Sequence, residues 1–371
     1  MSKTVGNGLA AIALSATIAL LAVGCGDDDC QSLPDDGLGE PTAWERELLD
    51  AENWPSPPTP QFLAGEEEVP LAYRTSTAED VADEETVVLF VHGSSTHSGA
   101  YTILGEGLSE RGVHARFVDL RGHGLSVCRP DGNCEDPASI QRTYGDDGVY
   151  YPGRPGDSRD KNQLVRDLSR HIEDVRTNHA EARLLVAGHS SGAGLVLRFL
   201  ERGGLEQVDG VALLSPFYHP DQPQSSMQEF ECGRKQSGNG YAVVDLGALG
   251  AALRGEVHRY VLSFRKGDAY EQPLDTLQNT YTTMTGMQTS SADDFAAAIS
   301  TPVLWVAARE DALLDLEIQR REFEKLPEGG HFVVAEQTSH VGLGWSDGVA
   351  ELLADWATEP DSVTVESIEP Q

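Results

Sequence analysis

The residues best suited to do chemistry stand in the stretch Gly188-His189-Ser190-Ser191-Gly192, between an apolar run and a helical pattern. A serine at such a turn either satisfies a need for small residues or acts as a nucleophile. Flanking glycines permit a strained backbone and keep Cβ atoms away from the serine, whose Oγ is then exposed at a helix N-terminus. The helix dipole and the following N–H group favour negative charge there. We therefore expect Ser190 to be a nucleophile.

A serine hydroxyl is a weak nucleophile unless a general base takes its proton. His340 stands where such a base is expected, because "HFVVAEQTSH" reads as a strand and a short loop before the last predicted helix. The other histidines fit less well: His189 adjoins the serine and points elsewhere, His331 begins a strand, and His219 opens a long insertion. The sequence therefore predicts His340 as the base.

An acid that orients the imidazole and stabilises its charged form completes this arrangement. The strand "TPVLWVAA" is followed by Glu310, Asp311 and Asp315. Asp311 lies in the first turn beyond the strand, whereas Asp315 is better placed to start the next helix and Glu310 to face solvent. We expect Asp311 to be the acid.

Two backbone N–H groups are needed to hold the negative oxygen that forms during acyl transfer. One is expected from Ser191, directly after the nucleophile. The other is expected from Ser94, in the loop "HGSSTHSGAY" after the first long buried strand.

Apolar runs and helical patterns alternate along the chain, which predicts an α/β fold with a mainly parallel sheet covered by helices on both faces. The stretch "EVPLAYRTS" is expected to be an antiparallel strand at the sheet edge. Residues 217–300 separate two strands by far more than a crossover needs, and their weakly helical pieces are expected to form a lid over the carboxyl ends of the strands.

The stretches "LFVHGSSTHSGAY", "VDLRGHGLS", "VAGHSSGAG" and "PVLWVAAREDALL" occur in the order and spacing of the α/β-hydrolase superfamily. The chain resembles its monoacylglycerol lipase and lysophospholipase branch over about residues 66–358. The resemblance implies an α/β-hydrolase fold with a lid and a catalytic set in the chain order Ser190, Asp311, His340. It assigns "DLRGHGLS" a structural turn and no catalytic role. The sequence departs from many relatives at Ser191, where a larger residue such as Met is common, and in "AARED", where a glycine commonly precedes the acid.

These residues favour a serine hydrolase that cleaves carboxylic esters, with a lipid-derived acyl group as the narrower expectation, and this chemistry needs neither a metal nor an organic cofactor. One alternative is a peptidase or amidase of the proline-iminopeptidase kind, which needs an acid in the lid to hold the substrate's α-amine. Another is a non-catalytic binding module on the same scaffold. The net charge of −33 makes nucleic acid a poor partner, and the oligomeric state stays open.

The N-terminal segment has the pattern of an export signal. A start carrying Lys3 precedes an apolar run, Leu9 to Val23, and "AVGC" ends at Cys25. This resembles a bacterial lipobox, so we expect a signal peptide over 1–24 and a lipid anchor on Cys25; an ordinary signal peptide is the alternative. Gly26 rather than aspartate after the cysteine favours the outer membrane over the inner membrane of the cell envelope.

The segment that follows, residues 25–62, is acidic and rich in Pro and Gly. It is expected to be a largely extended tether whose Trp44 and Trp54 pack back onto the domain. Residues 63–360 are expected to form the hydrolase domain and residues 361–371 a C-terminal tail.

Export implies an oxidising compartment, in which the cysteines other than Cys25 are able to pair. Cys128 and Cys134 flank a turn-rich loop, so we expect them to form a local disulfide, which leaves Cys30 to pair with Cys232.

Overall fold

The computed structural model describes residues 40–50, 54–78, 86–129, 132–140, 145–222, 227–230, 234–237, 241–266, 270, 272–293, 295–327 and 329–370. The predicted signal peptide, the predicted lipidation site Cys25, and Cys30 and Cys232 lie outside these residues. Among the helices of this part of the chain, none is long and apolar enough to cross a membrane.

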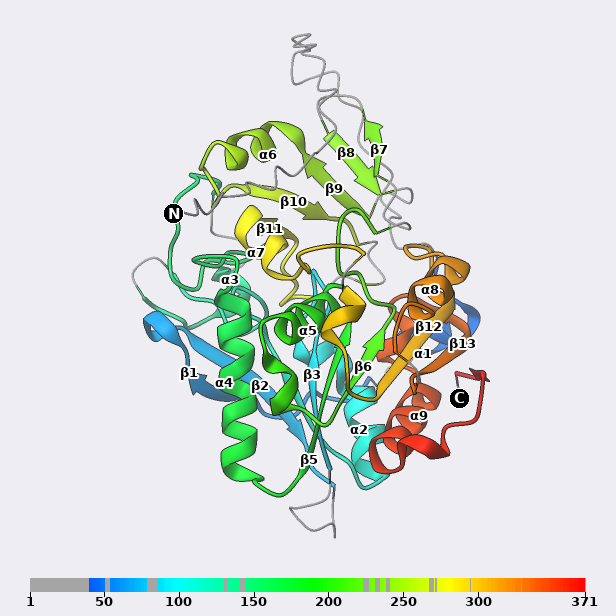
Figure 1. Cartoon of the computed structure of the whole chain (residues 1–371). Coiled ribbons are helices and arrows are strands. Elements are labelled where there is room, and N and C mark those ends of the chain that lie inside the picture. Colours follow the sequence, from blue (N-terminus) through cyan, green and yellow to red (C-terminus); the bar gives the residue numbers. More distant parts are fainter. Residues whose placement is uncertain are drawn as a thin grey trace, which may run out of the picture. The chain divides into compact units, whose positions relative to one another are not determined.

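A nine-stranded sheet forms the centre of the described domain, in the order β1-β2-β4-β3-β5-β6-β12-β13-β14 (Figure 1). The pairs β1–β2 and β2–β4 are antiparallel, and the other neighbouring pairs are parallel. The strands are β1 (Gln61–Ala64), β2 (Pro70–Ser76), β3 (Thr86–Val91), β4 (His114–Val118), β5 (Arg183–His189), β6 (Gly210–Leu214), β12 (Val303–Glu310), β13 (His331–Ser339) and β14 (Ser367–Ile368). The predicted fold class is confirmed.

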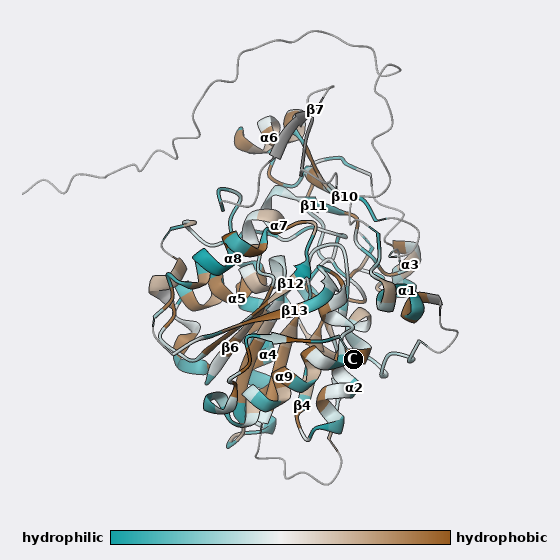
Figure 2. Cartoon of the chain, turned by 90° about the vertical axis from the view of Figure 1, so that its right-hand side faces the viewer, coloured by the Kyte–Doolittle hydropathy of each residue, from teal (hydrophilic) through white to brown (hydrophobic). Residues whose placement is uncertain are grey.

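Helices cover both faces of this sheet because its central strands are apolar on both sides. All six residues of β3 are buried, as are all five of β6, which is the pattern of a parallel sheet between two helical layers. Figure 2 shows the strands of the main sheet around β6 largely in the hydrophobic colours. The helices are α1 (Ala43–Asp50), α2 (Thr102–Glu110), α3 (Pro137–Ile140), α4 (Gln163–Asn178), α5 (Ser191–Glu201), α6 (Leu246–Leu253), α7 (Tyr281–Gly286), α8 (Leu316–Phe323) and α9 (Asp347–Thr358).

Two apolar clusters hold the layers together, one on each face of the sheet. On one face, Leu168 of α4 and Leu195 of α5 pack in the same cluster as Leu89 of β3. On the other face, Leu104 of α2 and Trp356 of α9 pack in the same cluster as other strand residues. Each fully buried apolar side chain of this size contributes about 1.5–3 kcal/mol relative to exposure, so the sheet that positions the site is well supported on both sides.

The long insertion between β6 and β12 is a lid with its own antiparallel sheet, in the order β11-β10-β9-β8-β7 (Figure 1). Its strands are β7 (Met227–Phe230), β8 (Arg234–Ser237), β9 (Ala242–Asp245), β10 (Tyr260–Phe264) and β11 (Gln278–Thr280). The expectation of weakly helical pieces is correct for α6 and α7 but missed this sheet. Its strands are three to five residues long, too short for an alternating pattern to stand out against the surrounding polar residues.

The lid is fixed to the main domain through a buried carboxylate. One oxygen of Asp157 accepts hydrogen bonds from the hydroxyls of Thr280 and Thr282, at 2.7 and 3.1 Å, and lies 3.0 Å from Nδ1 of His258. These three residues belong to the lid, whereas Asp157 precedes α4. These contacts hold the lid in a defined position on the main domain.

The described part of the predicted tether, from Glu40 onward, is not a free linker: it contains a helix and a strand that pairs with the main sheet. Residues 43–50 form α1, and residues 61–64 form the edge strand β1, which pairs with β2. The expectation that Trp44 and Trp54 pack back is confirmed: Nε1 of Trp44 donates to the carbonyl of Gln337 at 2.7 Å, and Trp54 meets Trp345 edge-on. A tryptophan buries much apolar area on packing, which outweighs the tendency of the acidic, Pro-rich surroundings to stay extended.

The predicted C-terminal tail, residues 361–371, contributes a short strand to the main sheet. Ser367 and Ile368 form β14, which pairs with Val334 and Ala335 of β13 as the ninth strand. Two residues are too few for a strand pattern to be recognised in sequence, and the pairing arises because the edge of β13 is available.

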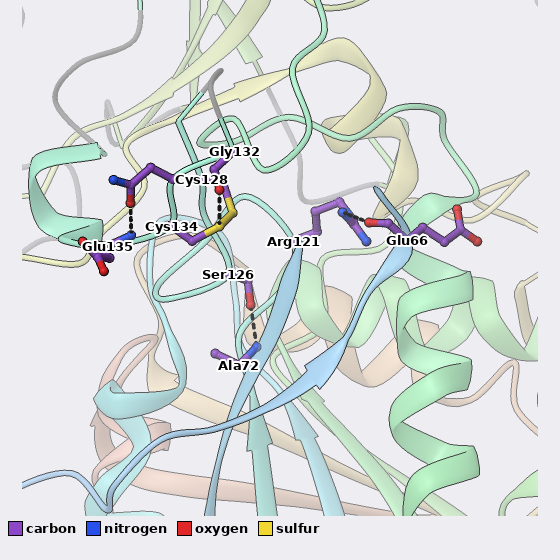
Figure 3. The surroundings of a disulfide bond; sticks show 9 residues. Glu66, Ala72, Arg121, Ser126, Cys128, Gly132, Cys134 and Glu135 are labelled. Carbon is purple, nitrogen blue, oxygen red and sulfur yellow. Dashed lines mark hydrogen bonds between the residues drawn. A yellow bond between two sulfur atoms is a disulfide. The ribbon is translucent and has the colours of Figure 1, made fainter. Parts of the chain in front are cut away.

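The disulfide between Cys128 and Cys134 is present, which confirms the predicted local pair (Figure 3). It closes a loop that directly follows the turn after β4. That turn is itself bound to β2, because the amide of Ala72 donates to the hydroxyl of Ser126 at 2.9 Å. The disulfide thus restricts the conformations of a loop whose preceding turn is already hydrogen-bonded to the sheet.

Candidate active site

Ser190 occupies the turn between β5 and α5 and has a strained backbone, with φ 54° and ψ −125°. A non-glycine residue with positive φ persists only where its surroundings enforce it. Here its amide donates to the carbonyl of Leu214 at 2.9 Å, and its carbonyl accepts from the amide of Phe217 at 3.0 Å. A Cβ atom on Gly192 would lie 2.3 Å from the carbonyl oxygen of His92, so this turn requires glycine there. The geometry is that expected of a nucleophile elbow.

His340 and Asp311 form a buried hydrogen-bonded pair. Nδ1 of His340 donates to Oδ2 of Asp311 at 2.8 Å, and the two side chains are 6% and 1% exposed. Oδ1 of Asp311 accepts from the amides of Leu313 and Leu314 at 2.8 and 2.9 Å, which fixes the carboxylate. Because Nδ1 carries the proton, Nε2 of the neutral imidazole is left as an acceptor.

Asp315 and Glu310, the two acidic residues that were not predicted to orient the histidine, have other roles. Asp315 caps α8, accepting from the amide of Ile318 at 3.0 Å. Glu310 is exposed at the end of β12. Of the three carboxylates that follow the strand, Asp311 is the one bonded to His340.

Ser190 and His340 line the same pocket, which lies between the main sheet and the lid. Tyr241, Lys266, Tyr270 and Gln272 come from the lid, whose elements stand beyond the carboxyl ends of the parallel strands (Figure 1). The other lining residues are Gly93, Ser94, Thr96, Ala100, Tyr101, His189, Val341 and Trp345. The nucleophile and the base proposed from the sequence therefore share one cavity.

The two residues expected to supply N–H donors lie beside each other: Oγ of Ser94 is 2.6 Å from Oγ of Ser191. Ser191 is the first residue of α5, where helix geometry provides no intrahelical acceptor for the N–H group and the dipole favours negative charge. The loop that carries Ser94 is connected to the lid, because Oγ of Ser95 is 2.6 Å from the hydroxyl of Tyr241. Tyr241 was not identified from the sequence, since it lies directly before the short lid strand β9 and belongs to no recognisable motif.

His189 connects His340, Tyr101 and Gly93 through hydrogen bonds. From the sequence it was expected only to point away from Ser190. Its Nε2 donates to the carbonyl of His340 at 2.9 Å, so in the neutral ring Nδ1 accepts from the hydroxyl of Tyr101 at 2.8 Å. That hydroxyl accepts from the amide of Gly93 at 3.2 Å. Burial, with His340 beside it, holds the pKa of His189 well below the usual value, which keeps the ring neutral.

The turn after β4, which was expected to be structural, forms buried contacts away from the pocket. Arg121 makes a two-pronged ion pair with Asp167 of α4, at 2.7 and 2.9 Å. His92 joins this turn to the end of β3: its Nε2 accepts from the amide of Leu120 at 3.0 Å and its Nδ1 donates to the carbonyl of Gly93 at 2.7 Å. Burial lowers the pKa of His92 to about 4, so this ring is neutral near pH 7.

The family model for Hydrolase_4, described as "Serine aminopeptidase, S33", matches residues 82–344, which include the elbow, the lid and both members of the His–Asp pair. The chain belongs to the Hydrolase_4 family. It is thus a member of the α/β-hydrolase superfamily.

One relative resembles part of this Hydrolase_4 protein at the sequence level. Over 146 residues the chain is 30% identical to a protein of Schizosaccharomyces pombe named "Putative monoglyceride lipase". The match covers 38% of this chain and 32% of the relative, so it spans about a third of that protein's length.

Solved structures share the fold over most of their length. A monoacylglycerol lipase of Paleococcus ferrophilus matches with a TM-score of 0.52 and 20% identity, covering 78% of this chain and 98% of that one. A soluble variant of monoglyceride lipase from Saccharomyces cerevisiae, in complex with a substrate analog, matches with a TM-score of 0.55 and 13% identity, covering 83% and 97%. A thermophilic esterase from Thermogutta terrifontis matches with a TM-score of 0.51 and 15% identity, covering 80% and 97%. At these identities the likeness establishes the α/β-hydrolase fold alone.

Proposed function

We propose that this protein is a serine hydrolase that cleaves carboxylic esters through an acyl-enzyme on Ser190. The observation that carries the proposal is the buried 2.8 Å bond from Nδ1 of His340 to Asp311, with His340 and Ser190 lining one pocket. This arrangement leaves Nε2 of His340 available as a general base on the side of the imidazole away from Asp311.

In the proposed first half-reaction, Oγ of Ser190 attacks the ester carbonyl carbon while Nε2 of His340 takes the hydroxyl proton. The negative oxygen of the tetrahedral intermediate is held by the N–H groups of Ser94 and Ser191. The carbon–oxygen bond to the alcohol then breaks, and His340 returns its proton to the departing oxygen. The alcohol leaves, and the acyl group stays on Ser190.

In the second half-reaction, His340 takes a proton from water, whose oxygen attacks the acyl carbon. Collapse of this intermediate releases the carboxylic acid, and the proton returns to Oγ of Ser190. Asp311 stabilises the imidazolium in both halves and holds the tautomer that has its proton on Nδ1. These steps balance without any further reactant.

The pocket favours esters over substrates with a free α-amine. An aminopeptidase needs a carboxylate to bind that amine, and the described residues that line the pocket include the cation Lys266 but neither Asp nor Glu. Lys266 is itself 2.7 Å from Asp275, whose side chain is buried behind it. The ester proposal therefore fits this lining better than the aminopeptidase activity that the family description names.

We extend the proposal to esters with a lipid-derived acyl group, of the monoacylglycerol or lysophospholipid type. Tyr270, Val341 and Trp345 give the pocket an apolar wall, which suits an acyl chain because apolar area is removed from water on binding. The names of the S. pombe and P. ferrophilus relatives support the same class.

The deciding experiment is a p-nitrophenyl ester series of increasing acyl length, run beside a panel of aminoacyl anilides. We expect ester cleavage in the wild type and its loss in Ser190→Ala, which keeps the fold. Preferential anilide cleavage would favour the peptidase, and cleavage of neither class by well-folded wild-type protein would favour the binding module.

We also propose that the mature protein is exported to the bacterial cell envelope and held at the membrane, with the outer membrane favoured, by lipid on Cys25. The support is the sequence pattern alone. Cys25→Ser should move the protein out of the membrane fraction; unchanged partition, with an unacylated N-terminus in mass spectrometry, would contradict this.

A further inference from the structure

The described residues 41–50 together with Trp54, here called the N-terminal arm, contact the end of β13, which leads into His340. Nε1 of Trp44 donates to the carbonyl of Gln337 at 2.7 Å, and Oε1 of Glu45 accepts from the amide of Ser339 at 2.8 Å. Both contacts fall on the three residues that precede His340. The arm thus binds the backbone that places the proposed base.

This backbone needs outside support because β13 leaves its regular pairing there. Ala308 of β12 pairs with Ala335, but Glu310 pairs with Ser339, so two extra residues lie on the β13 side. Gln337, inside this irregular stretch, has a φ of 50°. Strained, irregular backbone of this kind persists when neighbouring groups fix it, and the arm supplies two such groups.

Glu45 is built into this contact. Its side chain is fully buried, and its second oxygen accepts from the amide of Thr42 at 2.8 Å. A Cβ atom on Gly342 would lie 1.8 Å from Oε1 of Glu45, so the chain after His340 approaches the carboxylate as closely as glycine permits. A buried carboxylate is costly unless it is hydrogen-bonded, and here its bonds go to the amides of its own arm and of the His340 loop.

The arm also supports the wall of the pocket. Trp54 packs edge-on against Trp345 with ring centroids 5.3 Å apart, and Tyr270 of the lid packs on the same tryptophan at 5.8 Å. These rings belong to a small apolar cluster, separate from the two core clusters, to which the arm contributes Trp44, Leu48, Leu49 and Trp54. The arm therefore lies behind residues that line the pocket.

We propose that the N-terminal arm is a functional part of the active site and that Glu45 is a positioning residue for His340. Glu45 acts through the Ser339 amide: it holds the irregular end of β13 so that the imidazole stays between Asp311 and Ser190. The proposal rests on the proposed hydrolase function, in which His340 is the base. It also gives a part of the predicted tether a catalytic consequence.

The test compares the full mature chain with Glu45→Ala, Glu45→Gln and Arg46→Ala, using the best p-nitrophenyl ester and assay temperatures well below each melting temperature. We expect Glu45→Ala to lower kcat by about 10–100-fold, since misplacing a catalytic group by about 1 Å costs about 10²-fold, while KM changes less than about threefold. Glu45→Gln keeps an oxygen for the Ser339 amide and should recover most of the loss. Arg46, on the same helix, has a side chain that is 58% exposed and should be neutral when replaced.

Trp44→Phe provides an independent check if Glu45→Ala does not fold, because it keeps an aromatic ring in the apolar cluster and removes the N–H donated to Gln337. It should lower kcat about three- to tenfold with little change in KM. The positioning role is overturned if folded variants of Glu45 and Trp44 keep kcat within about twofold of wild type, or if the Gln variant is as impaired as the Ala variant. Ser190→Ala is the benchmark for the reaction itself: if it is as active as wild type, the proposed function fails, whatever the arm variants do.

Discussion

Asp119 and Asp311 are two aspartates with buried side chains that stand directly after strands β4 and β12, at the carboxyl ends of the parallel strands. Each fixes a loop by accepting from backbone amides. Asp119 accepts from Ser98 at 2.6 Å and from Leu125 at 2.9 Å, and Asp311 accepts from two amides of its own loop. In these bonds from backbone amides the two aspartates are equivalent.

They differ in the remaining neighbour. Arg74, a permanent cation, lies 3.7 Å from Asp119, whereas the second oxygen of Asp311 accepts from His340, which lines the pocket. Burial by itself would raise the pKa of Asp119, but His97 and Arg74 beside it outweigh burial and hold that pKa below its usual value. Position in the fold therefore does not by itself assign a role. Asp119 faces a buried permanent cation away from the pocket, whereas Asp311 is bonded to an imidazole that lines the pocket together with Ser190.

The largest expected effect is that of Asp311→Asn. An amide neither holds the required imidazole tautomer nor stabilises imidazolium, and in a serine protease the same change costs about 10⁴ in kcat. We expect a loss of that order with a near-normal melting temperature, because the loop amides keep an oxygen acceptor. Steady-state ester kinetics beside a melting curve measure both. If Asp315→Asn were the inactive variant, the acid would lie one helical turn further along the chain.

Asp119→Asn should lower the stability of the protein strongly and its activity only little, the reverse of the effect expected of Asp311→Asn. Removing this carboxylate leaves Arg74 buried without its countercharge, a kind of change that costs about 3 kcal/mol or more, while kcat should stay within about tenfold. Urea unfolding followed by fluorescence gives the free energy of unfolding. A large drop in kcat without loss of stability would mean that the two aspartates are not distinct in role.

The pH dependence of stability tests the structural role of the turn that follows Asp119, because this turn contains the buried His123. Burial lowers the pKa of His123 to about 3, so in the folded state this ring is neutral while the unfolded chain titrates near 6.5. Between those values the unfolded state binds more protons, so stability is full above about pH 6.5 and is lost as pH falls. From pH 7 to pH 5 the cost is up to about 2 kcal/mol for one such histidine.

The matching experiment measures unfolding free energies of wild type and His123→Asn at pH 7 and pH 5. The variant should lose less stability between the two values, by about 2 kcal/mol. Parallel losses in both proteins would show that His123 is not held neutral.

The smallest effect is expected from Asp315→Asn. Asparagine caps helices about as well as aspartate, so the change removes only the favourable charge at the start of α8, a few tenths of a kcal/mol. kcat should stay within about twofold, and differential scanning calorimetry should show a barely shifted transition. A large loss of activity would transfer to Asp315 the role now proposed for Asp311.

Much of the fold could be predicted because its signals are contiguous in sequence. The unbroken apolar runs of β3 and β6 indicate strands buried on both faces, and their alternation with helical patterns indicates a parallel sheet. The lid sheet was missed because its strands are only three to five residues long. The ends of the domain were misjudged, since α1 and β14 acquire their stability from partners far away in sequence.

By itself, the sequence determined the parts of the site that depend on local backbone conformation. The glycines around Ser190 specify a strained turn between a strand and a helix, and the order of strands places Asp311 and His340 at one sheet edge. Only the tertiary structure decided which groups meet there: the bond from His340 to Asp311, the contact of His189 with Tyr101, and the approach of Glu45 to Ser339 across 294 positions of the chain. The physical reason is the distance along the chain over which each effect acts. Backbone preferences act over a few residues, whereas the burial and hydrogen bonding of side chains depend on neighbours that only the folded chain brings together.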